Sequence, residues 1–187
     1  MIGKLLFSLF GLLALAGAAS ASERAPDANW QERTIKALSP QQIEGYLEGR
    51  GMGMALPAEL NGYPGPRHVL KLADELDLSA DQLTGTRRLF EDMRRTAIAL
   101  GEQIVAREAA LDELFASGSV SQASLRDAAA ELGLLNGRLR AHHLGYHLAM
   151  RDLLDPHQIE SYQRLRGHAS PAASGGHGHG RHRHEAR

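Results

Sequence analysis

The chain has 187 residues, of which 43% are hydrophobic and only 5% aromatic, and it contains no cysteine. Its 21 basic and 22 acidic side chains nearly cancel, which gives no case for a nucleic-acid-binding protein. The absence of cysteine excludes disulfide bonds and attachment through a lipidated N-terminal cysteine. Because aromatic residues are few while Ala and Gly are abundant, we expect a thin helical assembly rather than a thick globular core.

The N-terminal residues have the pattern of a secretory signal peptide. Lys4 provides a basic start, residues 5–15 form an apolar run too short to span a bilayer, and residues 19–21 are small enough for cleavage. We therefore expect a cleaved signal peptide over residues 1–21, followed by an N-terminal segment over residues 22–37. Export to a bacterial periplasm is the simplest destination. The alternative is an uncleaved membrane anchor.

Three short segments share one pattern, and each predicts the start of a helix. A Ser or Asp caps the first free backbone N–H groups, and a Gln three residues later reaches back to the N–H of the capping residue. Two copies have Pro at the first helical position, where no hydrogen bond is lost. The segments are Leu38–Ile43, Leu78–Leu83 and Leu154–Ile159.

Apolar residues at three- and four-residue steps predict two long helices. The first runs over about residues 80–116 and has its apolar stripe at Phe90, Met93, Ala97, Leu100, Ile104, Leu111 and Leu114. After a break at residues 117–119, the second has its stripe at Leu125, Ala128, Leu132, Leu135, Leu139, His142, Tyr146, Ala149 and Leu153. The simplest result is an all-α fold with a long antiparallel hairpin. Shorter helices from Ser39, from about residue 67 to 76 and from Asp155 would pack near its ends, and residues 49–66 would form an irregular connector.

The second long helix also carries small residues four apart, at Ala129, Gly133, Gly137, Ala141, Gly145 and Ala149. Glycine inside a helix costs about 1 kcal/mol relative to alanine, so this ridge of small residues suggests that something approaches the backbone closely. We expect a partner helix, either the other long helix or one from a second subunit. The alternative is a locally flexible helix with no special contact.

Candidate chemistry lies almost wholly in histidine. His143 and His147 are one helical turn apart, and Met150 lies close to the same face, so two imidazoles and a thioether can converge. His68 could add a ligand if its helix docks beside the hairpin. This set is typical of half a site for zinc, and nickel, cobalt or copper are further candidates. The alternative is that His143 and His147 are solvated helix residues, and we interpret His142 as a packing residue.

The C-terminal residues 167–187 have no apolar pattern and are expected to be a disordered tail. Alternating histidines on such a tail can wrap a divalent ion, and they are His177, His179, His182 and His184. The alternative is a solubilising tail that binds metal only incidentally.

The three capping segments resemble the Leu-Thr-x-x-Gln motif of the periplasmic Spy/CpxP-like stress proteins, with Ser or Asp in place of Thr. Relatives of that family include zinc-resistance-associated proteins and heavy-metal sensors. The resemblance covers about residues 38–166, and the stretch from Gly49 to His68 is similar to the segment that precedes the hairpin in the metal-sensor branch. It implies a cradle-like dimer, and metal ligands at positions matched by His68, His143, His147 and Met150.

Residues and resemblance together predict a periplasmic, metal-responsive stress protein that binds zinc or a similar divalent cation for sensing or buffering. The alternative is an ATP-independent chaperone of the Spy/CpxP kind, and a purely structural dimeric module is a third possibility. We expect a homodimer or larger assembly, with a membrane-bound signalling protein or unfolded periplasmic clients as further partners. We expect no enzyme, because the sequence has no cysteine nucleophile, no His-Glu-x-x-His pair and no nucleophile elbow.

Overall fold

A computed structural model describes residues 30–168 of the chain. The chain divides into two compact units, residues 1–32 and 33–187, and every helix described belongs to the second unit. The predicted signal peptide and, from residue 169 onward, the histidine-rich tail lie outside the described residues. The described part contains helices and no strand. Its helices are α1 (Pro40–Leu47), α2 (Leu56–Glu59), α3 (Pro66–Lys71), α4 (Ala80–Ala116), α5 (Gln122–Leu153) and α6 (Pro156–Leu165).

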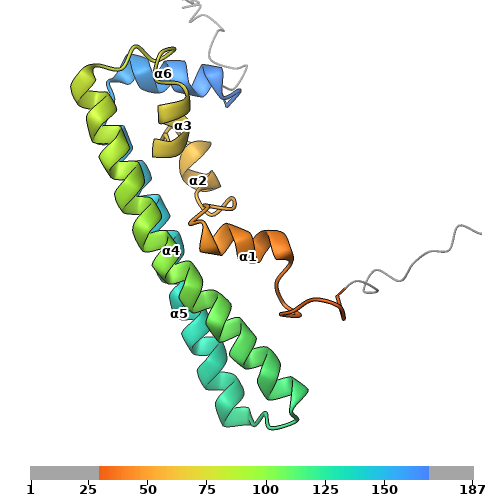
Figure 1. Cartoon of the computed structure of the whole chain (residues 1–187). Helices are drawn as coiled ribbons and strands as arrows, with labels where there is room; N and C mark the ends of the chain where they lie inside the picture. The colour runs from red at the N-terminus through yellow and green to blue at the C-terminus, as the bar shows by residue number, and fades with distance from the viewer. Residues whose placement is uncertain (1–29, 169–187) are drawn as a thin grey trace, which may run out of the picture. The chain divides into compact units, whose positions relative to one another are not determined.

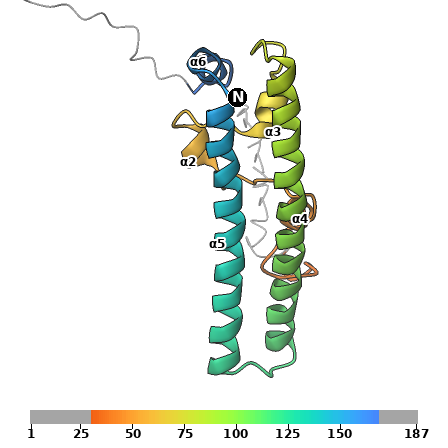
Figure 2. The ribbon, with the colours of Figure 1, turned by 90° about the vertical axis from the view of Figure 1, so that its left-hand side faces the viewer.

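The two long helices form the predicted antiparallel pair, which Figures 1 and 2 show side by side along their length. α4 begins and ends where the sequence pattern placed it, and the chain turns back through Gly118, whose φ of +68° suits a residue without a Cβ. Helix α6 crosses the end of the hairpin at which α4 begins and α5 ends (Figure 1). No helix among residues 30–168 is both long enough and apolar enough to span a bilayer.

The capping boxes predicted from the sequence are confirmed at the starts of α1, α4 and α6, with both reciprocal hydrogen bonds present in each. A box that we did not predict, Ser121 with Ser124, begins α5. Two of the capping glutamines also join their helices: Gln82 Nε2 donates to Gln158 Oε1 at 2.8 Å, and Gln158 Nε2 donates to the Leu76 carbonyl at 3.2 Å. The boxes therefore fix the relative placement of α4 and α6 as well as starting them.

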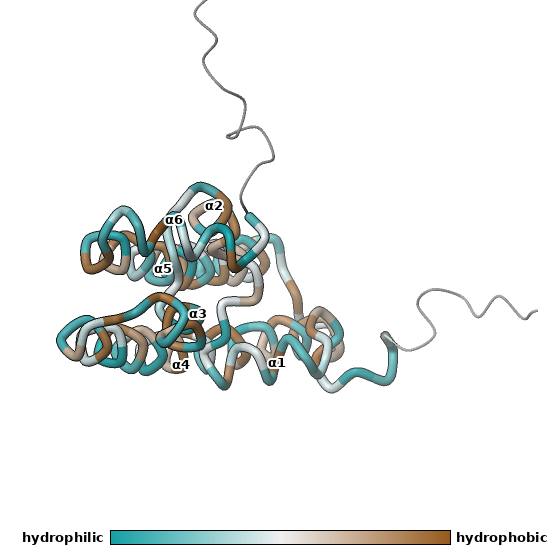
Figure 3. The backbone as a smooth tube through the Cα atoms, turned by 90° about the horizontal axis from the view of Figure 1, so that it is seen from above, coloured by the Kyte–Doolittle hydropathy of each residue, from teal (hydrophilic) through white to brown (hydrophobic). Residues whose placement is uncertain are grey.

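The short elements differ from expectation in two places. The connector contains a helix that we did not predict, α2, because Pro57 at its first turn starts a helical turn inside a glycine- and proline-rich segment. Helix α3 ends at Lys71 rather than near residue 76, and Asp77, with a φ of +47°, then turns the chain into α4. Seen along the hairpin (Figure 3), α1 and α3 lie beside α4 and α2 lies beside α5.

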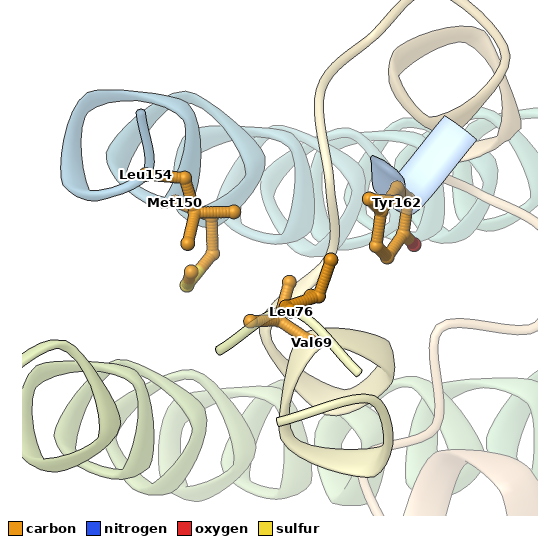
Figure 4. Close-up of a cluster of buried hydrophobic side chains, with 5 residues drawn as sticks. All are labelled: Val69, Leu76, Met150, Leu154 and Tyr162. Atoms are coloured by element: carbon orange, nitrogen blue, oxygen red, sulfur yellow. The ribbon is translucent and has the colours of Figure 1, made fainter. Parts of the chain in front are cut away.

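Buried apolar side chains form two clusters. One lies between α4 and α5 along the hairpin and contains Ala97, Ile104, Leu132, Leu135 and Leu139. The other joins α3, the end of α5 and α6, and contains Val69, Leu76, Met150, Leu154 and Tyr162 (Figure 4). The attachment of α3 and α6 to the hairpin therefore depends on the second cluster, at the end where the histidines lie, whereas Tyr46 of α1 packs against the first.

The ridge of small residues on α5 does not contact the other long helix. A Cβ added at Gly133, Gly137 or Gly145 would meet no atom within 4 Å, so the interpretation that α4 occupies this ridge is wrong. The close approach occurs at Gly101 of α4 instead, where a Cβ would collide with the backbone carbonyl of Tyr46 in α1. A second subunit on the α5 ridge stays a prediction.

Candidate functional site

The C-terminal half of α5 turns two histidines into the interior. His143 and His147 are only 2% and 6% exposed, so their interpretation as solvated helix residues is wrong. The buried face of α5 continues from Leu139 through these two residues, whereas the predicted stripe passed through His142 and Tyr146. His142 is half-buried, and its Nε2 donates to the Met93 carbonyl across the hairpin at 3.0 Å. The predicted stripe was therefore displaced by one residue over this half of the helix.

Glu59, the last residue of α2, is the buried acid of this region and was not singled out from the sequence. Its Oε1 accepts from His68 Nδ1 at 2.6 Å and from the Tyr162 hydroxyl at 3.2 Å. Its Oε2 accepts from Arg166 at 3.4 Å. One signal was available: Glu59 is the sole acidic residue between Glu48 and Asp74. Its contacts with α6, however, span more than a hundred residues.

The connector is held against α5 by two side chains of that helix. His147 Nδ1 lies 2.8 Å from the Tyr63 carbonyl oxygen, and Arg151 donates to the Gly62 carbonyl at 2.9 Å. A carbonyl oxygen only accepts, so His147 Nδ1 carries a proton and the Nε2 of the neutral ring keeps its lone pair. Metal-binding histidines are commonly oriented by this kind of bond from the second ring nitrogen.

Gly65 lets the acid and the imidazole approach each other. A Cβ at this position would lie 2.8 Å from Glu59 Oε1 and 2.8 Å from His147 Cε1, both closer than real Cβ contacts. The backbone conformation of Gly65 is an ordinary extended one, so the requirement for glycine here comes from space and not from φ. Glu59 and His147 therefore flank one backbone position.

Electrostatics keep Glu59 ionised. Burial alone would raise the pKa of Glu59, but the hydrogen bond from His68, the charge of Arg166 and the charge that His68 and His147 carry when protonated outweigh burial and lower the pKa to about 2. His68 Nδ1 thus donates to a carboxylate, which leaves His68 Nε2 free. Burial and the Glu59 charge raise the pKa of Tyr162, so its hydroxyl stays a donor.

His143 is a buried imidazole without a polar partner. Its Nδ1 faces Gly51 of the connector, and its Nε2 has no hydrogen-bond partner among residues 30–168. Burial lowers the pKa of His143, and the neighbouring His142 and His147 lower it further, to about 4. At neutral pH the ring is therefore uncharged and presents a lone pair that no protein donor uses.

These residues line one cavity of about 480 Å³ between the connector, α3 and the hairpin. Its polar lining consists of three imidazoles, four guanidinium groups and two carboxylates: His68, His143, His147, Arg50, Arg67, Arg94, Arg166, Glu48 and Glu59. Apolar lining comes from Met52, Leu56, Phe90 and Met93. The volume lies in the range of small-molecule sites, about 300–1,000 Å³.

The structure brings His68, His143 and His147 to this cavity, but not Met150. Met150 is fully buried in the apolar cluster with Val69 and Tyr162 and does not line the cavity. Within the described part of the chain, no three His, Asp or Glu side chains are grouped tightly enough to hold a metal ion. The tail candidates His177, His179, His182 and His184 lie outside the described residues.

Comparison with protein-family models found no match to this chain, and comparisons with curated proteins and with solved structures found none either.

Proposed function

We propose that this protein binds a divalent transition metal ion, such as zinc, nickel, cobalt or copper, in the cavity between the connector and the hairpin. The observation that carries the proposal is that three imidazoles lining one cavity each keep a ring nitrogen with no hydrogen-bond partner among the described residues. Two of these rings, His68 and His147, are oriented through Nδ1 by an oxygen acceptor. That leaves Nε2 as the donor atom, as zinc, copper and nickel sites use it.

The side chains that line the cavity offer the type of donor atom that such an ion prefers. Bound metal would take imidazole nitrogens, while Glu59 would act behind His68 as the carboxylate that fixes its tautomer and raises its basicity. The cysteine-free sequence favours imidazole-preferring ions over those that need thiolates. We further propose that binding serves sensing or buffering in the periplasm, with a homodimer and a membrane-bound signalling protein as the partners.

Calorimetric titration with zinc, nickel and copper tests this function. We expect binding at micromolar or tighter concentration that persists in a chain ending at Gly167 and is lost in His147→Ala. The matched control is His157→Ala, because His157 is an exposed histidine of α6 outside the cavity. Binding that disappears with the tail, or that survives His147→Ala, would contradict a site in the cavity.

An ATP-independent chaperone activity is the second candidate, and exposed leucines on α5 favour it. Leu134 and Leu148 are 54% and 57% exposed on the helix that also carries the open ridge of small residues. Such apolar surface is the kind that shields unfolded clients. The test is suppression of client aggregation in the presence of a chelator. Weaker suppression of aggregation by the double variant Leu134→Ser, Leu148→Ser than by the wild type would support chaperone activity. A client that aggregates at the same rate with and without the wild-type chain would exclude it.

A further inference from the structure

The cavity carries more positive charge than its own carboxylates neutralise. Glu59 is already paired with His68 and Arg166, and Glu48 is paired with Arg50 at 2.6 Å. The remaining two guanidinium groups, of Arg67 and Arg94, are exposed and have no acidic partner within residues 30–168. This surplus of positive charge would repel a bare cation and attract a ligand that carries negatively charged groups.

The cavity is also larger, and poorer in ligands, than a site that encloses a bare ion on all sides. A zinc ion lies about 2 Å from its ligands and takes about four of them. The volume here is about 480 Å³, and no three His, Asp or Glu side chains of the described residues are grouped to surround an ion. The remaining coordination positions are therefore open to water or to a ligand that enters with the metal.

The connector offers further hydrogen-bond donors to an anion. In the part of the chain that the structure describes, the backbone N–H groups of Gly51, Met52 and Gly53 donate to no acceptor. These residues line the cavity, and two of them have positive φ, +43° at Met52 and +81° at Gly53. Successive free N–H groups in a turn of this kind favour negatively charged oxygen atoms.

We infer that the ligand is a divalent metal ion already chelated by a small di- or tricarboxylate. The Nε2 atoms of His68 and His147 bind the metal, the chelator supplies its other oxygen ligands, and Arg67 with Arg94 pair with the carboxylate groups that remain free. This inference rests on the proposed metal-binding function and specifies the chemical form in which the metal enters. Only ligand exchange is involved, with no electron transfer.

Equilibrium dialysis of the full mature chain with radiolabelled citrate, in the presence and absence of nickel, tests the inference. We expect about one citrate retained per chain with nickel present and almost none without it. Arg67→Gln with Arg94→Gln should weaken the retention of citrate about tenfold or more, since two charge-assisted contacts are lost. Nickel alone should bind this variant at least as well as it binds the wild type.

The matched control is Arg87→Gln with Arg88→Gln, which removes the same charge from exposed positions of α4 outside the cavity. Its retention of citrate should equal that of the wild type, and circular dichroism should show the same helix content in both variants. Nickel that is bound in the presence of citrate, but with no citrate retained beside it, would overturn the inference and leave the proposed function intact. Equal retention of citrate with and without nickel would overturn the inference and indicate a site that binds the anion alone. Retention of neither would overturn both.

Discussion

The two halves of α5 use the same buried face for different purposes. In the first half the buried residues are leucines, which pack against Ala97 and Ile104 of α4. In the second half the equivalent positions hold His143 and His147, and these are buried as deeply as Leu139. The difference follows from what covers the helix: α4 and Tyr46 of α1 pack against the leucines, whereas the connector brings the Tyr63 carbonyl and the Glu59 carboxylate beside His147. Burial therefore does not distinguish packing from a polar site on this helix, but the polar groups of the covering segment do.

The largest expected effect is in the apolar half. Leu139 is 1% exposed, and Leu139→Ala should lower the free energy of unfolding by about 2–5 kcal/mol, because it removes buried methyl groups and leaves a cavity. Urea unfolding followed by circular dichroism measures this loss. The matched control is Leu134→Ala on the exposed face, which should cost about 1 kcal/mol or less. Equal costs at the two positions would contradict the packing described for α5.

In the polar half, Gly65→Ala should be the most damaging small change. Its Cβ would press against Glu59 Oε1 and His147 Cε1, so we expect a loss of about 2 kcal/mol in unfolding free energy together with weaker metal binding. Thermal unfolding and nickel titration of the same variant measure the two effects. A variant with wild-type stability and wild-type affinity would show that the connector does not press Glu59 against His147.

The polar half of α5 should also make the stability of the protein depend on pH, which the leucine half does not. The pKa of His143 is about 4 in the folded chain against an ordinary value of 6.5, so between these values the unfolded state binds the extra proton. Stability should therefore fall as the pH drops, by about 1–2 kcal/mol from pH 7 to pH 5. Glu59, with its pKa lowered to about 2, adds a further loss only below about pH 4.5.

His143→Leu removes this titrating side chain from the buried face, which keeps His147, and should flatten this dependence. Urea unfolding at pH 7, 6 and 5 measures the slope for the wild type and for the variant. His157→Leu, at an exposed position, should keep the wild-type slope. Equal slopes for His143→Leu and the wild type would show that His143 titrates as it does in water.

The smallest expected effect lies on the outer face of α5. Gly137→Ala adds a Cβ into open space and should raise the free energy of unfolding by about 0.5–1 kcal/mol, through helix propensity alone. Gly101→Ala on α4 should do the opposite, because its Cβ would collide with the Tyr46 carbonyl. If a second subunit packs on the ridge, Gly137→Ala would instead lower the mass measured by light scattering.

Local signals predicted the helices well. The capping boxes depend on four consecutive residues, and the two long helices depend on a periodicity repeated over many turns, so both can be read from the sequence. The short helix α2 was missed because four residues show no periodicity. The displaced stripe on α5 has a similar cause: His142 and His143 are identical neighbours, so hydropathy does not show which of the two faces the interior.

The candidate site was predicted only in part. His143 and His147 were found because their spacing lies within one helix. His68 was proposed as a further ligand if its helix docks beside the hairpin, and the family resemblance matched it as well. Glu59 was missed because its importance depends on Tyr162 and Arg166, which only the fold brings to it. Met150 shares a helix with His143 and His147 but packs into the apolar cluster. The deciding information was thus the contact of the connector with α5 and α6 at one end of the hairpin, which no local pattern contains.

The most direct test of the central claim is nitrogen NMR of the histidine rings during titration with zinc. The account predicts that the Nε2 resonances of His68 and His147 shift on binding while their Nδ1 atoms stay protonated by their oxygen partners, and that His157 does not change. Shifts confined to the histidines of the tail, with His68 and His147 unchanged, would contradict a metal site in the folded part of the chain.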